Sequence, residues 1–273
     1  MSFPALVKVI DTFDHPKRFR KLSNEKALEI IIHVLKSGIP WRQLDISSCS
    51  YHTVLKRFKI WMKNGVFEKL WKHFIEKYTL KRLESDPLAF KNIYIDSTMI
   101  KNIGGVNCTG KNPSDRGRLA TKMSAICDVN MVPLSATFYP ANLNDTNTIE
   151  TSIEKLPGRL KVNNRYSNTL IGDMGYISQA IAKEVWKESK IKILTGNRRN
   201  ATKTKKYLSP KKRQLLKSRH RVENLFCRLD KFKRLYVRVE KDILSYEAFN
   251  FLAMTLITLK WTEGTTSEIL TDI

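Results

Sequence analysis

The order of strand-like and helix-like runs after residue 87 limits the chain to few architectures. The strand-like runs are rich in β-branched, aromatic and apolar residues, and they lie at 93–96, 119–127, 134–139, 168–173 and 191–196. Helical patterns at 148–156 and 178–188 separate the later ones. Strands that first form a meander and then alternate with helices predict a mixed five-stranded α/β sheet with flanking helices.

Three helical patterns precede the sheet and predict a helix-turn-helix-like module over residues 1–86. Ser23 and Ser50 are typical N-cap residues, and glycines at 38 and 65 end the first two patterns. The third pattern covers residues 66–78. The change of pattern near Asp86-Pro87 predicts a domain boundary, with a second domain over 87–273.

The second helix of this module carries a basic face. We expect it to point outward to DNA, although a solvated face on a small bundle explains it equally well when the helix is taken alone. The residues of this face are His52, Lys56, Arg57, Lys59 and Lys63.

Charge narrows the class of partner. The chain has 49 Lys and Arg residues against 26 Asp and Glu residues, a formal charge of +23, which favours a polyanion such as nucleic acid. The most apolar run, 248–259, is shorter than the ~20 residues that cross a bilayer and predicts a buried helix. No secretion signal is evident and four scattered cysteines match no zinc motif, so we expect an intracellular protein, in the nucleoid of a prokaryote or the nucleus of a eukaryote.

Three acids stand out. Asp96 interrupts the apolar run FKNIYIDSTMI, and Asp173 ends the run NTLIGD between two glycines. A carboxylate among strand residues needs a hydrogen bond, a cation or a metal. Glu223 follows Arg219 by four residues on a predicted helix running from Ser209-Pro210 to Leu235, on the side away from its apolar stripe. Singly, each acid fits a turn cap or an ion pair, but together they favour a shared site.

These runs, in this order, resemble DDE transposases of bacterial insertion sequences, of the insertion-sequence-five type. The resemblance covers nearly the whole chain. YIDSTMI is similar to the strand of that family's first acid, IGDMGY to its second-acid motif, and RHRVENLFCRLDKFKRL to the helix that carries its glutamate.

The resemblance implies an RNase H-like core in which Asp96, Asp173 and Glu223 bind Mg²⁺, with Mn²⁺ as a substitute. It implies a transposase that nicks the ends of a mobile element and joins the freed 3′-hydroxyl to target DNA by two-metal-ion catalysis. The expected partners are double-stranded terminal inverted repeats, target DNA and further copies of the chain. Cations grouped near the acids are expected to hold phosphates, and these are Arg118, Lys122, Arg198, Arg199, Arg219, Arg221 and Arg234.

Two positions depart from the family's glutamate-helix pattern. Leu216 replaces a tyrosine and Asp230 replaces a lysine expected to contact DNA. We expect Asp230 to pair with Lys233 or Arg234, and Arg234 to supply the missing contact. A decayed or domesticated copy that binds DNA without cleaving it is the main alternative, followed by another RNase H-like nuclease and by a basic protein that coats nucleic acid.

Overall fold

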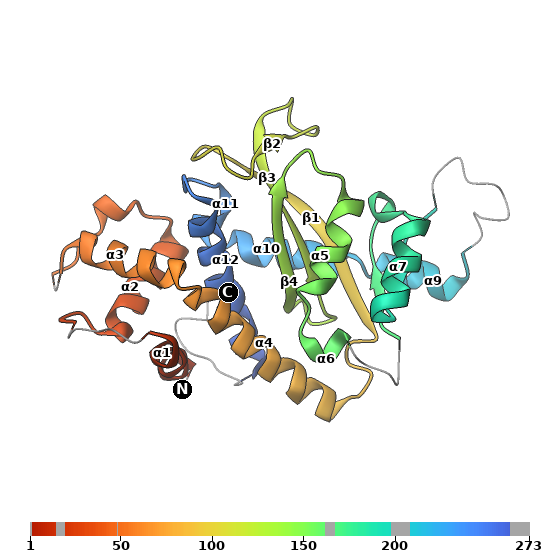
Figure 1. Ribbon diagram of the computed structural model, residues 1–273, viewed down its shortest axis with the longest axis horizontal. Helices are drawn as coiled ribbons and strands as arrows, with labels where there is room; N and C mark the ends of the chain where they lie inside the picture. Colours follow the sequence, from red (N-terminus) through yellow and green to blue (C-terminus); the bar gives the residue numbers. More distant parts are fainter. Residues whose placement is uncertain (1, 15–19, 48, 162–166, 198–207, 263–273) are drawn as a thin grey trace. The chain divides into compact units, whose positions relative to one another are not determined.

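A computed structural model describes residues 2–14, 20–47, 49–161, 167–197 and 208–262 of the chain (Figure 1). They fall into two compact units. The helical unit comprises Met1–Tyr78, Lys101–Asn107 and Arg228–Ile273, and the sheet unit comprises Thr79–Ile100 and Cys108–Cys227.

The sheet unit is built on a mixed sheet, as the sequence predicts. The strands are β1 (Asn92–Lys101), β2 (Gly110–Lys111), β3 (Leu119–Cys127), β4 (Pro133–Pro140), β5 (Thr169–Ile171) and β6 (Lys192–Leu194). Their order is β2-β3-β1-β5-β6, and β4 pairs with β3. β1, β5 and β6 run parallel, whereas β2 and β4 pair antiparallel with β3. The sheet therefore has six strands rather than five, because β2 is a two-residue strand that no periodicity reveals.

Short helices connect these strands. They are η2 (Asp145–Thr148), α5 (Ile149–Glu154), α6 (Gly158–Lys161), η3 (Met174–Tyr176) and α7 (Gln179–Ser189). α5 packs on β3 and β4, and α7 packs on β6 and α5. Buried Ile149 and Ile153 form the inner side of α5. Ser178 caps α7 as expected for a serine before a helix, because its side chain accepts a hydrogen bond from the backbone of Ile181.

The prediction of one long basic helix from Ser209-Pro210 to Leu235 is wrong. It is divided into α9 (Pro210–Lys217), α10 (His220–Asp230) and α11 (Lys233–Tyr236). At the first break the hydroxyl of Ser218 donates to the carbonyl of Leu215, 2.6 Å away, and also lies 3.2 Å from the hydroxyl of Tyr94. A serine that bonds to nearby backbone competes with helix hydrogen bonding, which explains an interruption at this residue.

The helical unit contains α1 (Ser2–Phe13), α2 (Asn24–Ser37), η1 (Trp41–Gln43), α3 (Tyr51–Lys63), the first part of α4 (Val66–Ser85), α11 and α12 (Ile243–Thr262). The predicted caps are present: Ser23 and Ser50 accept backbone hydrogen bonds, and Gly38 ends α2 in the left-handed conformation. α1 is an additional helix that the sequence reading did not anticipate.

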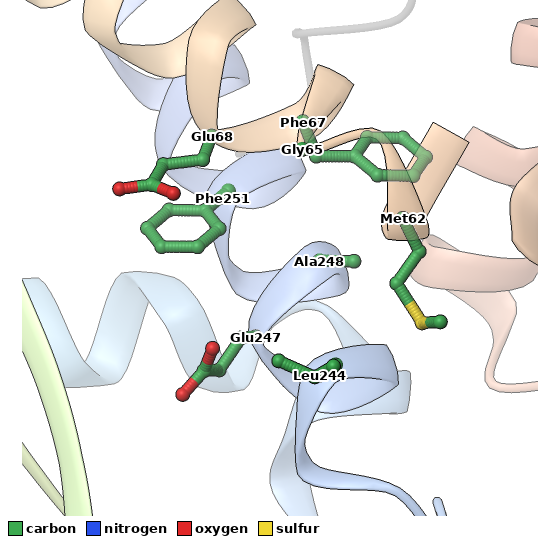
Figure 2. Close-up of a pocket in the computed structure, with 8 residues that line it drawn as sticks. All are labelled: Met62, Gly65, Phe67, Glu68, Leu244, Glu247, Ala248 and Phe251. Atoms are coloured by element: carbon green, nitrogen blue, oxygen red, sulfur yellow. The ribbon is translucent and has the colours of Figure 1, made fainter. Parts of the chain in front are cut away.

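α12 contains the apolar run 248–259, and every residue of that run is buried, as expected. Within the described residues, no helix combines the length and apolar character that a membrane span requires. Figure 2 shows Leu244, Glu247, Ala248 and Phe251 of α12 beside Met62, Gly65, Phe67 and Glu68 around a small pocket. This pocket has mostly apolar walls, and the cations predicted to bind DNA are not among its lining residues.

Asp14 is a buried acid that holds three parts of the helical unit together. Its carboxylate accepts hydrogen bonds from Arg20 at 2.5 Å and from the indole of Trp61 at 2.7 Å. Burial alone raises the pKa of Asp14, but these bonds and the charges of Arg20 and Arg57 bring that pKa below its ordinary value. The unfolded chain therefore binds this proton more readily than the folded chain, so the stabilisation exists at neutral pH and disappears as the pH falls below about 3.8.

We expect Asp14→Asn to lower the free energy of unfolding at pH 7 by about 1–3 kcal/mol, because the buried donors lose a charged acceptor. The difference in the free energy of unfolding between this variant and the unsubstituted protein should be smaller at pH 3. Urea unfolding at both pH values measures it, with exposed Glu29→Gln as the control. Equal effects of the two substitutions at pH 7 would contradict this role.

Candidate active site

The sheet places Asp96 on β1 and Asp173 just after the neighbouring strand β5. β1 and β5 are parallel, and Asn92 pairs with Thr169 in their register. The same 77-residue offset relates Asp96 to Asp173. Each acid thus follows the last paired residues, Tyr94 and Ile171, by two positions, where adjacent strands about 4.8 Å apart reach the end of β5.

Asp96 is mostly buried, with 18% of its side chain exposed. Its Oδ1 accepts a hydrogen bond from the backbone of Ser97 at 2.9 Å, and its Oδ2 accepts one from Arg219. Burial is the largest cause of a rise in the pKa of Asp96 to about 6, and the negative charges of Asp173 and Glu223 contribute to this rise. The hydrogen bond from Ser97 and the positive charge of Arg219 lower this pKa, but they do not offset the rise. Asp96 is therefore electrostatically coupled to both other predicted acids.

Arg219 connects Asp96 to Glu223. It lies in the turn before α10. Its Nη1 donates a hydrogen bond to Asp96, and its Nη2 lies 2.7 Å from Oε1 of Glu223. The opposite side of α10 carries buried Val222 and Leu225, as predicted. A single positive group thus occupies the position between two of the three acids.

Asp173 caps a turn. Its Oδ1 accepts a hydrogen bond from the backbone of Gly175 at 2.7 Å and starts η3. Its flanking glycines are closely packed, because a Cβ on Gly172 would lie 3.0 Å from the ring of Tyr176 and 3.1 Å from Ile95. A Cβ on Gly175 would lie 3.0 Å from Asp145 and from Asp173. Both glycines make room for the protein's own side chains.

The donor set suits a hard cation such as Mg²⁺, because three carboxylates supply oxygen ligands. The observation that supports this fit is Arg219, a cation already held by Asp96 and Glu223. Among the described residues, however, no three His, Cys, Asp or Glu side chains converge closely enough as they stand to hold a metal ion. Arg219 occupies carboxylate oxygens of Asp96 and Glu223, so a metal ion bound to those oxygens would displace it.

Asp145 was not predicted from the sequence. Its Oδ1 accepts hydrogen bonds from the hydroxyl of Ser97 at 2.6 Å and from the ammonium of Lys122 at 2.7 Å. Lys122 is 4% exposed at its side chain and also donates to the carbonyl of Leu143. Asp145 thus neutralises a buried lysine, fixes the residue after Asp96 and contacts the turn made by Asp173.

The predicted DNA-contacting cations divide into exposed and internally paired groups. On α3, His52, Lys56, Lys59 and Lys63 are exposed as expected. Arg57 does not face outward: it is 5% exposed and donates to Asn24 and to the carbonyl of Leu22. It stands between Val54 and Trp61 on the buried stripe.

The later cations show the same division. Arg118 is exposed and lies 3.7 Å from Asp115, whereas Arg221 donates to the carbonyl of Val129 and lies over the ring of Tyr94. Lys122 is buried against Asp145. Arg198 and Arg199 lie outside the described residues.

Arg234 is buried and lies 2.6 Å from Glu240, so it pairs with that acid instead of Asp230. Burial raises the pKa of Asp230. Arg234 thus has an acidic partner within the helical unit, and its expected DNA contact stays a prediction.

Comparison with known families agrees with the predicted family. The chain belongs to the transposase DDE domain family, whose model matches residues 91–258. Residues 6–71 also match the model of a putative transposase of the IS4/5 family. The resemblance to the insertion-sequence-five type is thereby confirmed at the level of the family.

Individual relatives are more distant. An uncharacterized 16.2 kDa protein of insertion element IS402 from Burkholderia cepacia is 30% identical over 94 residues, which cover 34% of this chain and 61% of that protein. A piggyBac transposase in a synaptic complex with hairpin DNA has a TM-score of 0.55 at 10% identity, covering 95% of this chain and 70% of that one. The catalytic domain of Mos1 mariner transposase covers 71% of this chain and 91% of its own, with a TM-score of 0.28 and 14% identity.

Proposed function

We propose that the chain is a DNA transposase that nicks the ends of a mobile element and joins the freed 3′-hydroxyl to target DNA. The observation that carries the proposal is the bridge from Asp96 through Arg219 to Glu223, together with the position of Asp173 two residues after β5, the strand that pairs with β1. The membership of residues 91–258 in the transposase DDE domain family supports the same function.

Asp96, Asp173 and Glu223 would hold two Mg²⁺ or Mn²⁺ ions. When bound, such ions lower the pKa of a water or hydroxyl nucleophile and stabilise charge on the phosphoryl group and the leaving oxygen. Asp96 would be one of the ligands, and its carboxylate lies close enough to Asp173 and Glu223 for their charges to act on it.

Arg219 pairs with Asp96 and Glu223, and it would take a second role if metal ions displaced it from these acids. Its guanidinium neutralises Asp96 and Glu223 in the structure. A released guanidinium at the same turn is positioned to donate two parallel hydrogen bonds to a DNA phosphate. We assign it the task of orienting the scissile strand.

The part of the DNA that lies beyond the three acids is proposed to bind the exposed face of α3 and Arg118 of the sheet unit. The residues of that face are His52, Lys56, Lys59 and Lys63. Contacts of this type neutralise phosphates and are sequence-independent. Joining two element ends also calls for more than one copy of the chain in a synaptic complex. The proposed location is the nucleoid or nucleus, where the DNA substrate lies.

A nicking assay tests this function. Supercoiled plasmid and a short duplex with free 3′-hydroxyl ends are incubated with the protein in Mg²⁺, Mn²⁺ or EDTA. Nicked circles and joined products are expected with either cation, and EDTA should abolish both because the carboxylates then lack the ions that activate the nucleophile. Tight DNA binding without either product in Mg²⁺ or Mn²⁺ would instead establish the alternative, a transposase-derived protein that binds DNA but does not cleave it.

A further inference from the structure

A lysine-rimmed pocket of about 510 Å³ lies beside the first residues of β1 and β5 and along β6. Asn92, Thr169 and Lys192 form one row across β1, β5 and β6, and all three line it. Asp96 lies four residues further along β1, about 13 Å at 3.3 Å per residue. The pocket is therefore separate from the candidate active site, although both belong to the sheet unit.

The rim of this pocket is positively charged. It contains the exposed side chains of Lys91, Lys192, Lys211 and Lys212, and none of the residues described as lining the pocket is acidic. Four like charges around one hollow repel each other unless an anion neutralises them. The walls between them are apolar side chains with a few amide and hydroxyl groups. This combination suits a ligand with both sugar surface and phosphate charge.

A half-exposed tryptophan lies beside the rim. The ammonium of Lys192 is 5.3 Å from the ring centre of Trp186, and that of Lys190 is 5.8 Å from it. Trp186 itself is 41% exposed. Cations at this distance are attracted to the ring face, so Trp186 helps to hold Lys192 at the pocket.

We propose that this pocket binds the phosphodiester backbone of duplex DNA at a point away from the cleavage site. The inference rests on the proposed function and adds a contact that neither the basic face of α3 nor the acids provide. Lysine heads are compact point charges on flexible stems, which suits sequence-independent contact with a backbone rather than a shaped cage for one small anion.

The length of α9 indicates that the duplex bound at the pocket is the same one that reaches the acids. Lys211 and Lys212 at its start line the pocket, and Arg219 follows its end by two residues. An eight-residue helix is about 12 Å long, which equals three to four base-pair steps along a duplex. One duplex can therefore contact the pocket and Arg219 together.

Charge neutralisation tests the pocket. Lys192→Gln, Lys211→Gln and Lys212→Gln are combined, and the matched control combines Lys155→Gln, Lys183→Gln and Lys187→Gln, three exposed lysines of the same unit that do not line the pocket. Binding of a labelled 30-base-pair duplex is measured in EDTA at several salt concentrations. We expect the pocket variant to lose about tenfold or more in affinity and two to three units of salt slope, and the control to lose less than about threefold.

The outcomes separate this inference from the proposed function. If the unsubstituted chain binds and nicks DNA but the pocket and control variants bind equally, the pocket inference alone is overturned. If the unsubstituted chain binds no DNA, both are overturned. Trp186 gives an independent readout: duplex DNA should change tryptophan emission in the unsubstituted protein, and Trp186→Phe should remove most of that change. Identical changes in both proteins count against the pocket.

Discussion

Replacing Asp96 by asparagine should reduce metal-dependent nicking by about 10³-fold or more. An amide cannot supply the negative charge that a shared cation requires, and a loss of about 4 kcal/mol of transition-state stabilisation corresponds to this factor. Glu223→Gln should have an effect of the same order. Initial rates of plasmid nicking in Mg²⁺ and Mn²⁺ measure both.

The matched control is Glu150→Gln, which removes an exposed acid from α5 in the same unit. It should nick at a rate within about twofold of the unsubstituted protein, since isolated surface substitutions rarely affect the fold. Asp96→Asn should keep its thermal midpoint close to that of the unsubstituted protein, because it removes a buried charge as well as an ion pair. Nicking by Asp96→Asn at the control rate would remove this residue from the site.

Asp145→Ala should have the largest effect on stability, about 3–5 kcal/mol, because it leaves the buried ammonium of Lys122 without its counter-ion. Ser97 loses an acceptor at the same time, so the position of Asp96 becomes less defined. Urea unfolding measures the first effect. Nicking at a temperature where the variant remains folded measures the second.

The double variant Lys122→Met with Asp145→Ala separates these two roles. Removing both charges should restore most of the stability, since an apolar replacement of a buried pair is often neutral. Nicking should stay low, because the Ser97 hydroxyl still lacks its partner. Full recovery of nicking in the double variant would mean that Asp145 acts only by neutralising Lys122.

Local patterns predicted most of the fold. Serine caps and a glycine stop defined α2 and α3, and alternating β-rich and helical runs defined five of the six strands. The break at Ser218 was missed because the residues around it favour helix, and only the side-chain hydrogen bonds of Ser218 in the folded chain show the competition. The packing of α12 with α2 and α3 depends on long-range contacts that no local period encodes.

The candidate site was predicted in part, by one physical rule. An acid among strand residues needs a partner, and this rule found Asp96 and Asp173. Applied to the strand that contains Lys122, the same rule would have demanded an acid, but it could not have said that Asp145 supplies it. The burial of Arg57, by contrast, could have been predicted from the sequence, because Arg57 lies between Val54 and Trp61 on the apolar stripe of the helix.

Titration of the chain with Mn²⁺ in the absence of DNA is the most direct test of the central claim, that Asp96, Asp173 and Glu223 form one cation site. Calorimetry of the unsubstituted protein and of Asp96→Asn, Asp173→Asn and Glu223→Gln reads out binding without catalysis, with Glu150→Gln as the control. The account predicts that each of the three site variants loses at least about tenfold in affinity, a loss that even residues supporting a metal ligand produce. Mn²⁺ binding of full affinity by any of the three would contradict it.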